Sequence, residues 1–111
     1  MQINKADNYT ILTDDKGDFL GFANHLDGVV PKQYSENNLV IDLLAFDDLT
    51  LDDLLNLLRL STYHRSTGHS FVIVSVAVDV DDIPMELVVV PTLQEAEDII
   101  QMEEIERDLG F

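Results

Sequence analysis

The chain contains no cysteine and no tryptophan, and only 6 of its 111 residues are lysine or arginine. The absence of cysteine excludes disulfide bonds, thiolate chemistry and cysteine-ligated zinc sites. The few basic residues stand against 22 acidic ones, which gives a net charge of -16. Phosphate backbones and anionic membranes repel such a surface, so the composition argues against nucleic-acid binding and membrane association. The favoured ligand is a protein partner that offers a cationic patch.

Long apolar runs are also missing, and the first residues show no apolar core of a signal peptide. Because a membrane-spanning helix needs about 20 apolar residues, we expect a cytoplasmic protein that does not enter a membrane. Apolar residues still make up 46% of the chain, which is enough to build a hydrophobic core. At this length the chain is expected to fold as a single domain over residues 1–111.

Hydrophobic periodicity predicts strands that alternate with helices, which indicates an α/β fold with a small mixed sheet of four to five strands. The first two strands are expected to form a hairpin, and right-handed crossovers are expected to join the last three. The longest apolar run, FVIVSVAV, is the candidate for the sheet centre. An alternative order of elements adds a short helix near Pro84. The strands are expected over residues 2–6, 9–13, 39–44, 71–78 and 87–90.

Three helices are predicted, each behind a residue whose side chain is a good N-cap: Asp18, Thr50 and Thr92. Pro31 is expected to stop the first helix, because proline cannot donate a backbone hydrogen bond. The second helix is expected to run unbroken to the neighbourhood of Arg65. Its buried stripe is expected to comprise Leu51, Leu54, Leu55 and Leu58, and Leu57 and Leu60 are expected to widen it. The last helix is expected to bury Leu93, Ala96, Ile99, Ile100 and Met102, with Leu109 and Phe111 folding back onto the body.

A buried strand, an acidic turn and a leucine-rich helix follow one another in LVIDLLAFDDLTLDDLLNLLRL, residues 39–60. The turn after a strand is where α/β folds usually hold a functional site. This turn can present negative charge, but it has no glycine, serine, cysteine or histidine that would serve catalysis. Leu60 lies off the central leucine stripe and is a further candidate for partner contact. The candidate partner-binding residues are Asp47, Asp48, Thr50, Asp52, Asp53 and Leu57.

The aspartates of the turn allow other interpretations. Carboxylates suit Mg²⁺ or Ca²⁺, so a metal-dependent hydrolase is one alternative, and a structural subunit of a homo-oligomer is another. Acids in the first turn of a helix are, however, favoured by the helix dipole alone. We therefore expect no metal site, no cofactor and no enzymatic activity, in a monomer or homodimer. Asp42 is expected to bond nearby backbone amides or a loop hydroxyl and so to fix the turn.

Two segments make the chain resemble the STAS family, the domain of bacterial anti-sigma factor antagonists and of anion-transporter tails. LVIDLLAFDDLTLDDLLNLL is similar to the family's strand VxLDL, which leads into Asp-Ser-Ser/Thr-Gly and an apolar helix. ELVVVPTLQEAEDII is similar to its closing strand and the helix that begins Thr/Ser-x-x-Glu-Ala. The resemblance implies a STAS-like fold and a non-enzymatic interaction module, with an anti-sigma factor or another regulator as partner.

The family register places Asp-Ser-Ser-Gly on residues 50–53 of this chain. Asp52 thereby occupies the position of the serine that is phosphorylated in the switchable members. An aspartate carries one negative charge where phosphoserine carries nearly two. The resemblance leaves two interpretations open: a permanently phospho-like turn, or a turn that has lost the switch.

The histidines form no catalytic or metal-binding pattern. Chains of this kind are sometimes labelled ribonuclease Z, but that metallo-hydrolase needs a His-x-His-x-Asp-His cluster, which is absent here. His25 stands alone, whereas His64, Arg65 and His69 make the one cationic neighbourhood of the sequence. We interpret that neighbourhood as a helix end, where positive charge opposes the helix dipole.

Overall fold

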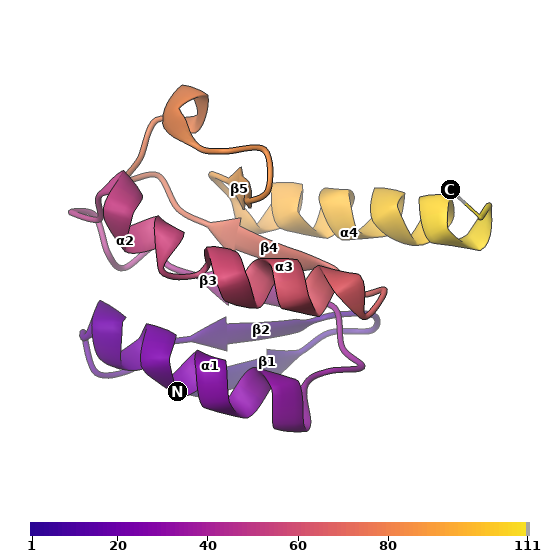
Figure 1. Ribbon diagram of the computed structural model, residues 1–111, viewed down its shortest axis with the longest axis horizontal. Coiled ribbons are helices and arrows are strands. Elements are labelled where there is room, and N and C mark those ends of the chain that lie inside the picture. Colours follow the sequence, from indigo (N-terminus) through magenta and orange to yellow (C-terminus); the bar gives the residue numbers. More distant parts are fainter. Residues whose placement is uncertain (111) are drawn as a thin grey trace.

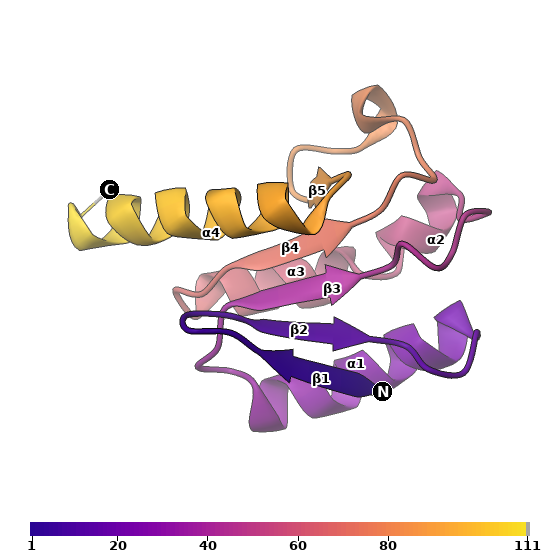
Figure 2. The same cartoon turned by 180° about the vertical axis from the view of Figure 1, so that it is seen from behind.

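The computed structural model describes residues 1–110 as one five-stranded sheet with helices on both faces (Figure 1, Figure 2). The strands lie in the order β1-β2-β3-β4-β5, with β1 antiparallel to β2 and all other neighbours parallel. The α/β fold with a small mixed sheet is therefore confirmed. The strands are β1 Gln2–Lys5, β2 Thr10–Thr13, β3 Leu39–Asp42, β4 Phe71–Val74 and β5 Val88–Val90.

The helices are α1 Phe19–Gln33, α2 Leu51–Leu55, α3 Leu58–Ser66 and α4 Leu93–Asp108, with a short 3-10 helix, η1, over Val80–Asp82. Helices α1, α2 and α3 pack on one face of the sheet, and α4 packs on the other. The alternative with an extra short helix near Pro84 is confirmed by η1. None of the helices within residues 1–110 combines the length and the apolar character that crossing a bilayer requires.

The central strand is β3 rather than β4. The predicted eight-residue strand ends at Val74, although β4 is buried on both faces. The Ser75 N–H still donates to the Val90 carbonyl at 3.0 Å, but the Ser75 hydroxyl then accepts from the Ala77 N–H at 3.2 Å and turns the chain away. The apolar run outlasts the strand because Ala77 packs against the core from the following loop. The expectation of a long central strand here is wrong.

Pro31 lies inside α1 instead of ending it. Its ring removes the hydrogen bond to the carbonyl of Asp27, which is an exposed residue, so water can satisfy that carbonyl. The helix then runs only as far as Gln33, and the Tyr34 N–H donates to the Val30 carbonyl at 3.0 Å to close the last turn. One lost bond on the solvent side does not stop the helix, so the predicted end is wrong.

The predicted second helix is divided at Asn56 and Leu57 into α2 and α3. The N–H of Asn56 donates to the Asp53 carbonyl at 3.1 Å, and that of Leu57 to the Leu54 carbonyl at 2.9 Å, so the turn tightens. The Asn56 side chain also donates to the carbonyls of Asp52 and Asp53, each at 3.2 Å. Such local bonds compete with regular helix, which explains the break.

Helix α4 makes a narrow contact with the sheet. Its buried residues are Ala96 and Ile100, which pack against valines of β3 and β4. The expectation for Phe111 lies outside the described residues. The predicted burial is wrong for three residues, which are exposed: Leu93, Met102 and Leu109.

The start of α4 is confirmed at the predicted N-cap. The Oγ1 of Thr92 accepts a hydrogen bond from the Glu95 N–H at 3.1 Å. Thr92→Ala should lower the free energy of unfolding by about 1 kcal/mol, because it leaves that N–H without a side-chain acceptor. Urea denaturation measures the loss. Thr92→Ser keeps the hydroxyl and serves as the control, whereas equal stability of Thr92→Ala and wild type would contradict the cap.

Candidate functional site

The acidic turn lies at the carboxyl ends of the parallel strands, where β3 passes into the loop before α2 (Figure 1). Asp42 ends β3, and its Oδ1 accepts from the Leu44 N–H at 3.0 Å. The predicted role of Asp42 in fixing the turn is confirmed by this bond. Further along the loop, Phe46 packs edge-on against Phe19 of α1, with ring centroids 5.9 Å apart. The loop is thereby held to the body at both of these points.

The residues that cap α2, Thr50 and Asp53, are distinct from Asp52, whose carboxylate takes no part in the cap. The Oγ1 of Thr50 accepts from the Asp53 N–H at 3.2 Å, and the Oδ2 of Asp53 accepts from the Thr50 N–H at 3.0 Å. These two bonds form a capping box behind the predicted N-cap, and Asp53 is half-buried within it. Asp52 beside it is exposed, and its carboxylate has no hydrogen-bond or ion-pair partner among residues 1–110. Its negative charge is presented to solvent.

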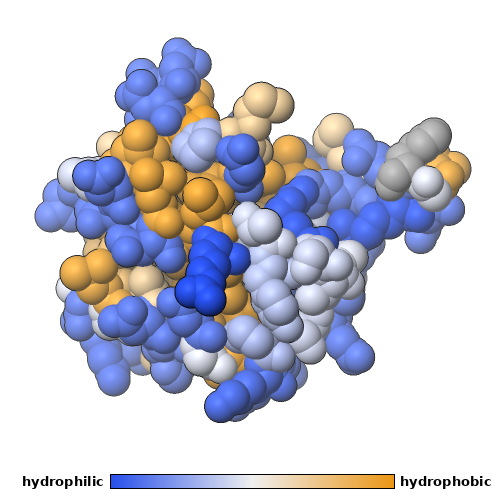
Figure 3. Space-filling view, in the orientation of Figure 1, coloured by the Kyte–Doolittle hydropathy of each residue, from blue (hydrophilic) through white to orange (hydrophobic). Residues whose placement is uncertain are grey.

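Apolar side chains accompany the exposed acids of the turn. Asp47 and Asp48 are exposed, and Leu44 and Leu55 are 38% and 36% exposed. Figure 3 shows apolar atoms gathered over α2 and the connection between β4 and β5, with hydrophilic atoms around them. We call the acidic turn together with α2 the carboxyl-edge surface. Its residues are Leu44, Asp47, Asp48, Thr50, Asp52, Asp53 and Leu55.

Two leucines that were predicted to contact a partner belong to the core. Leu57 is 0% and Leu60 is 4% exposed, so the prediction for both is wrong. An unbroken helix would place them off the buried stripe, but the break at Asn56 changes the direction in which the following side chains point. Leu55 shows the opposite change, from predicted burial to exposure. The apolar spacing of an unbroken helix gives no indication that Leu55 is exposed while Leu57 and Leu60 are buried.

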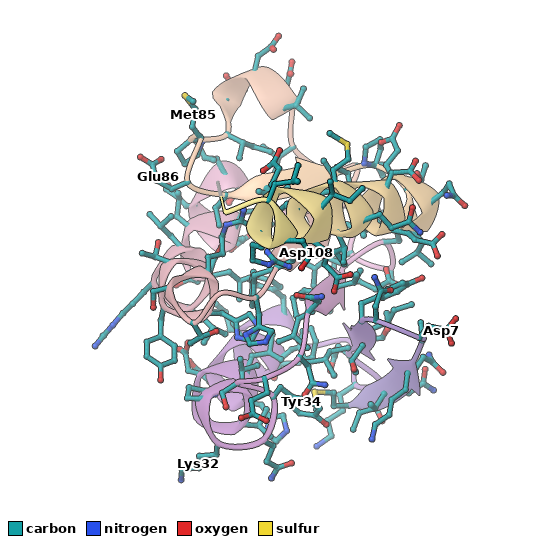
Figure 4. The ribbon with its side chains drawn as sticks, turned by 90° about the vertical axis from the view of Figure 1, so that its right-hand side faces the viewer. Asp7, Lys32, Tyr34, Met85, Glu86 and Asp108 are labelled. Carbon is teal, nitrogen blue, oxygen red and sulfur yellow. The ribbon has the colours of Figure 1, made fainter. Side chains whose placement is uncertain are left out.

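A polar cluster lies at the opposite edge of the sheet, where the parallel strands begin. The Oε1 of Glu104 accepts from the Asn38 amide at 2.7 Å, and its Oε2 accepts from the Asn8 amide at 3.0 Å. The Oδ1 of Asn38 accepts from the Ser70 N–H at 2.8 Å. Figure 4 looks onto this edge, between Asp108 at the end of α4 and Tyr34 at the end of α1. These bonds tie α4 to the starts of β3 and β4.

Charged residues extend the same cluster. Glu103 accepts from the Ser70 hydroxyl at 2.6 Å and forms an ion pair with Arg65 of α3. Arg107 donates to the Ser70 hydroxyl at 3.3 Å and to the Asn38 Oδ1 at 3.2 Å. Sequence reasoning missed these contacts, because they join residues that are far apart in the chain. We call the set the polar clamp: Asn8, Asn38, Arg65, Ser70, Glu103, Glu104 and Arg107.

His64 is a buried core residue beside the polar clamp, with 0% of its surface exposed. Its ring packs against Phe71, with the ring centroids 5.9 Å apart. Its Nε2 donates to the Asn37 carbonyl at 2.7 Å, since a carbonyl can only accept. Burial lowers the pKa of His64 below its ordinary value, so the ring is neutral at pH 7. The interpretation of His64 as a cation at a helix end is therefore wrong.

The carboxyl-edge surface offers negative charge beside apolar side chains. Within residues 1–110, no group of three or more His, Asp or Glu side chains is placed to hold a metal ion. A scan against protein-family models finds no match for this chain, and a search of curated proteins finds none either.

Proposed function

We propose that the chain is a non-enzymatic protein-interaction module, similar to a STAS anti-sigma factor antagonist, and that its carboxyl-edge surface docks a partner with a cationic patch. The observation that carries the proposal is the exposed carboxylate of Asp52. Thr50 and Asp53 already complete the capping box of α2 without it. A charge that forms no structural bond at the carboxyl end of a sheet is available to a partner.

Charge and apolar area contribute to binding in different ways. The exposed carboxylates of Asp47, Asp48 and Asp52 attract a cationic partner over a distance and raise its rate of association. Leu44 and Leu55 add exposed apolar area, whose burial contributes affinity. A polar rim around apolar contacts is the usual anatomy of a protein–protein interface. The favoured partner is an anti-sigma factor or another regulator with clustered lysine and arginine.

The family register supports the same location, because it assigns Asp52 to the position of the switch serine. A negative charge is also favoured there by the N-terminus of α2. Two interpretations of the charge on Asp52 predict opposite effects on partner binding. An acidic docking surface attracts its partner through Asp52, whereas a permanently phospho-like turn weakens binding to an anti-sigma partner. The direction of a change in affinity therefore separates the two.

Asp52→Ser should weaken partner binding by about two- to fivefold, the effect of losing one rim charge, and the loss should shrink at high salt. The partner is first recovered by pull-down from the native lysate, and its Kd is then measured at two salt concentrations. The folding cost should be only about 0.5 kcal/mol, since the variant loses an interaction with the helix dipole and no hydrogen bond. A gain in affinity would instead identify the phospho-like turn.

Asp7→Ser is the matched control, because it removes the same charge from an exposed residue in the turn between β1 and β2, at the opposite edge (Figure 4). It should leave the partner's Kd close to that of wild type. Identical affinities of wild type, Asp52→Ser and Asp7→Ser at both salt concentrations would place the docking surface elsewhere.

A further inference from the structure

The C-terminal half of α4 carries an apolar stripe on the side that faces away from the sheet. Met102, Ile105 and Leu109 follow the spacing i, i+3 and i+7, and they are 56%, 59% and 65% exposed. At about 100° per residue, these positions lie opposite Ala96 and Ile100, the buried residues of the helix. The outward stripe, Met102, Ile105 and Leu109, therefore has no partner within the described fold.

The polar clamp determines which side of α4 faces outward. Glu103, Glu104 and Arg107 lie on the inner side of the same helical turns, and each is bound to a residue at the edge of the sheet or at the end of α3. Rolling the helix to bury the stripe would break these bonds and leave partly buried charges without partners. Both Figure 1 and Figure 2 show this half of α4 reaching beyond the strands.

We propose that the outward stripe is a second docking surface, separate from the carboxyl-edge surface, for an amphipathic helix whose apolar face is flanked by lysine and arginine. Apolar residues at i, i+3 and i+7 are the usual anchors when one helix binds along another surface. Exposed acids border the stripe at Asp98, Glu106 and Asp108. The C-terminal end of a helix is also the negative end of its dipole, so the flanks of the partner must be positive.

A second copy of the chain is a poorer occupant than a cationic helix. Two molecules of net charge -16 repel each other. Pairing two stripes would also bring the acidic borders at Asp98 and Glu106 against those of the other copy. The only arginine in the last turn, Arg107, points inward and is bound to Ser70 and Asn38, so it does not offset that repulsion.

Two synthetic peptides of identical composition test this proposal on the whole chain. In the first, leucines at i, i+3, i+4 and i+7 form a stripe between lysines, and in the second the same residues are permuted so that no stripe exists. Both are attracted equally to an acidic surface, so the permuted peptide measures non-specific attraction. We expect the striped peptide to bind at least about tenfold more tightly, because only it can bury a continuous apolar face. Its NMR shift changes should centre on residues 98–110.

The double variant Met102→Gln with Ile105→Gln should abolish that preference. Leu20→Gln is the matched control, because Leu20 is an equally exposed apolar residue, 57% exposed, but lies on α1. Thermal unfolding of both should stay close to wild type, since all three side chains are exposed. Equal binding of the two peptides to wild type, or an undiminished preference in the double variant, would overturn the proposal. So would a dimer that the double variant dissociates. Asp52→Ser should leave the preference unchanged, so the two docking proposals fail independently.

Discussion

Leu57→Ala should lower the free energy of unfolding by about 2–5 kcal/mol, the range for a large-to-small change in a packed core. Leu57 is fully buried, and it belongs to the core cluster between the sheet and the helices of the first face. Truncation removes apolar contacts and leaves a cavity that the surroundings refill only in part. The substitution keeps the backbone N–H of residue 57, which can still donate to the Leu54 carbonyl, so the cost should come from the lost side-chain packing.

Leu55→Ala is the matched control for Leu57. It makes the same substitution two residues earlier, at a side chain that is 36% exposed, and should cost no more than about 1 kcal/mol. Chemical denaturation with unchanged m-values compares the two variants directly. A larger loss for Leu55→Ala than for Leu57→Ala would mean that the helix is not broken at Asn56 and that Leu57 faces solvent after all.

Acidification from about pH 7.5 to about pH 5.5 should destabilise the wild type through His64. Burial lowers the pKa of His64 in the folded state and outweighs the hydrogen bond to the Asn37 carbonyl, which raises it; the neighbouring His69 and Arg65 act in the same direction as burial. The unfolded chain then binds more protons, so stability is fully present above the ordinary pKa of 6.5 and is lost as the pH falls below it. The slope from one proton approaches about 1.4 kcal/mol per pH unit at most.

His64→Gln should be stable at neutral pH, and it should not show the loss of folding stability on acidification that His64 causes in the wild type. Its amide can still donate to the Asn37 carbonyl, and it has no charge to gain on acidification. The difference between wild type and His64→Gln across the pH range isolates His64, since acids elsewhere titrate in both proteins. Parallel curves for wild type and His64→Gln would show that His64 is not a buried neutral residue.

Local chemistry accounts for the parts of the fold that were predictable. Asp18, Thr50 and Thr92 each accept a hydrogen bond from the N–H three residues further on, as their capping side chains predict. Such a bond needs only a few neighbouring residues, so it can be recognised without knowledge of the rest of the chain. The β1–β2 hairpin and the mixed sheet follow likewise from apolar periodicity and turn residues.

The candidate site was predictable only in part. The sequence alone located the acidic turn and the N-cap Thr50, and the structure keeps Asp47, Asp48 and Asp52 exposed there. The sequence did not reveal that Leu55 is exposed and Leu57 buried. The exposure of Leu55 and the burial of Leu57 depend on the break at Asn56, whose side chain bonds to carbonyls of the preceding turn. The burial of Leu57 against the sheet favours that break.

Composition and local patterning by themselves determined the acidity, the absence of thiol chemistry, the α/β class and the starts of α1, α2 and α4. Tertiary structure alone decided that His64 is neutral, that the carboxylate of Asp52 has no bonding partner within residues 1–110 and that α4 turns its apolar stripe outward. The bonds that orient α4 span long stretches of chain, such as Glu104 to Asn38 over 66 residues and Arg107 to Asn38 over 69. A side chain's exposure and charge depend on what the whole fold places beside it, and periodicity in one segment cannot supply that information.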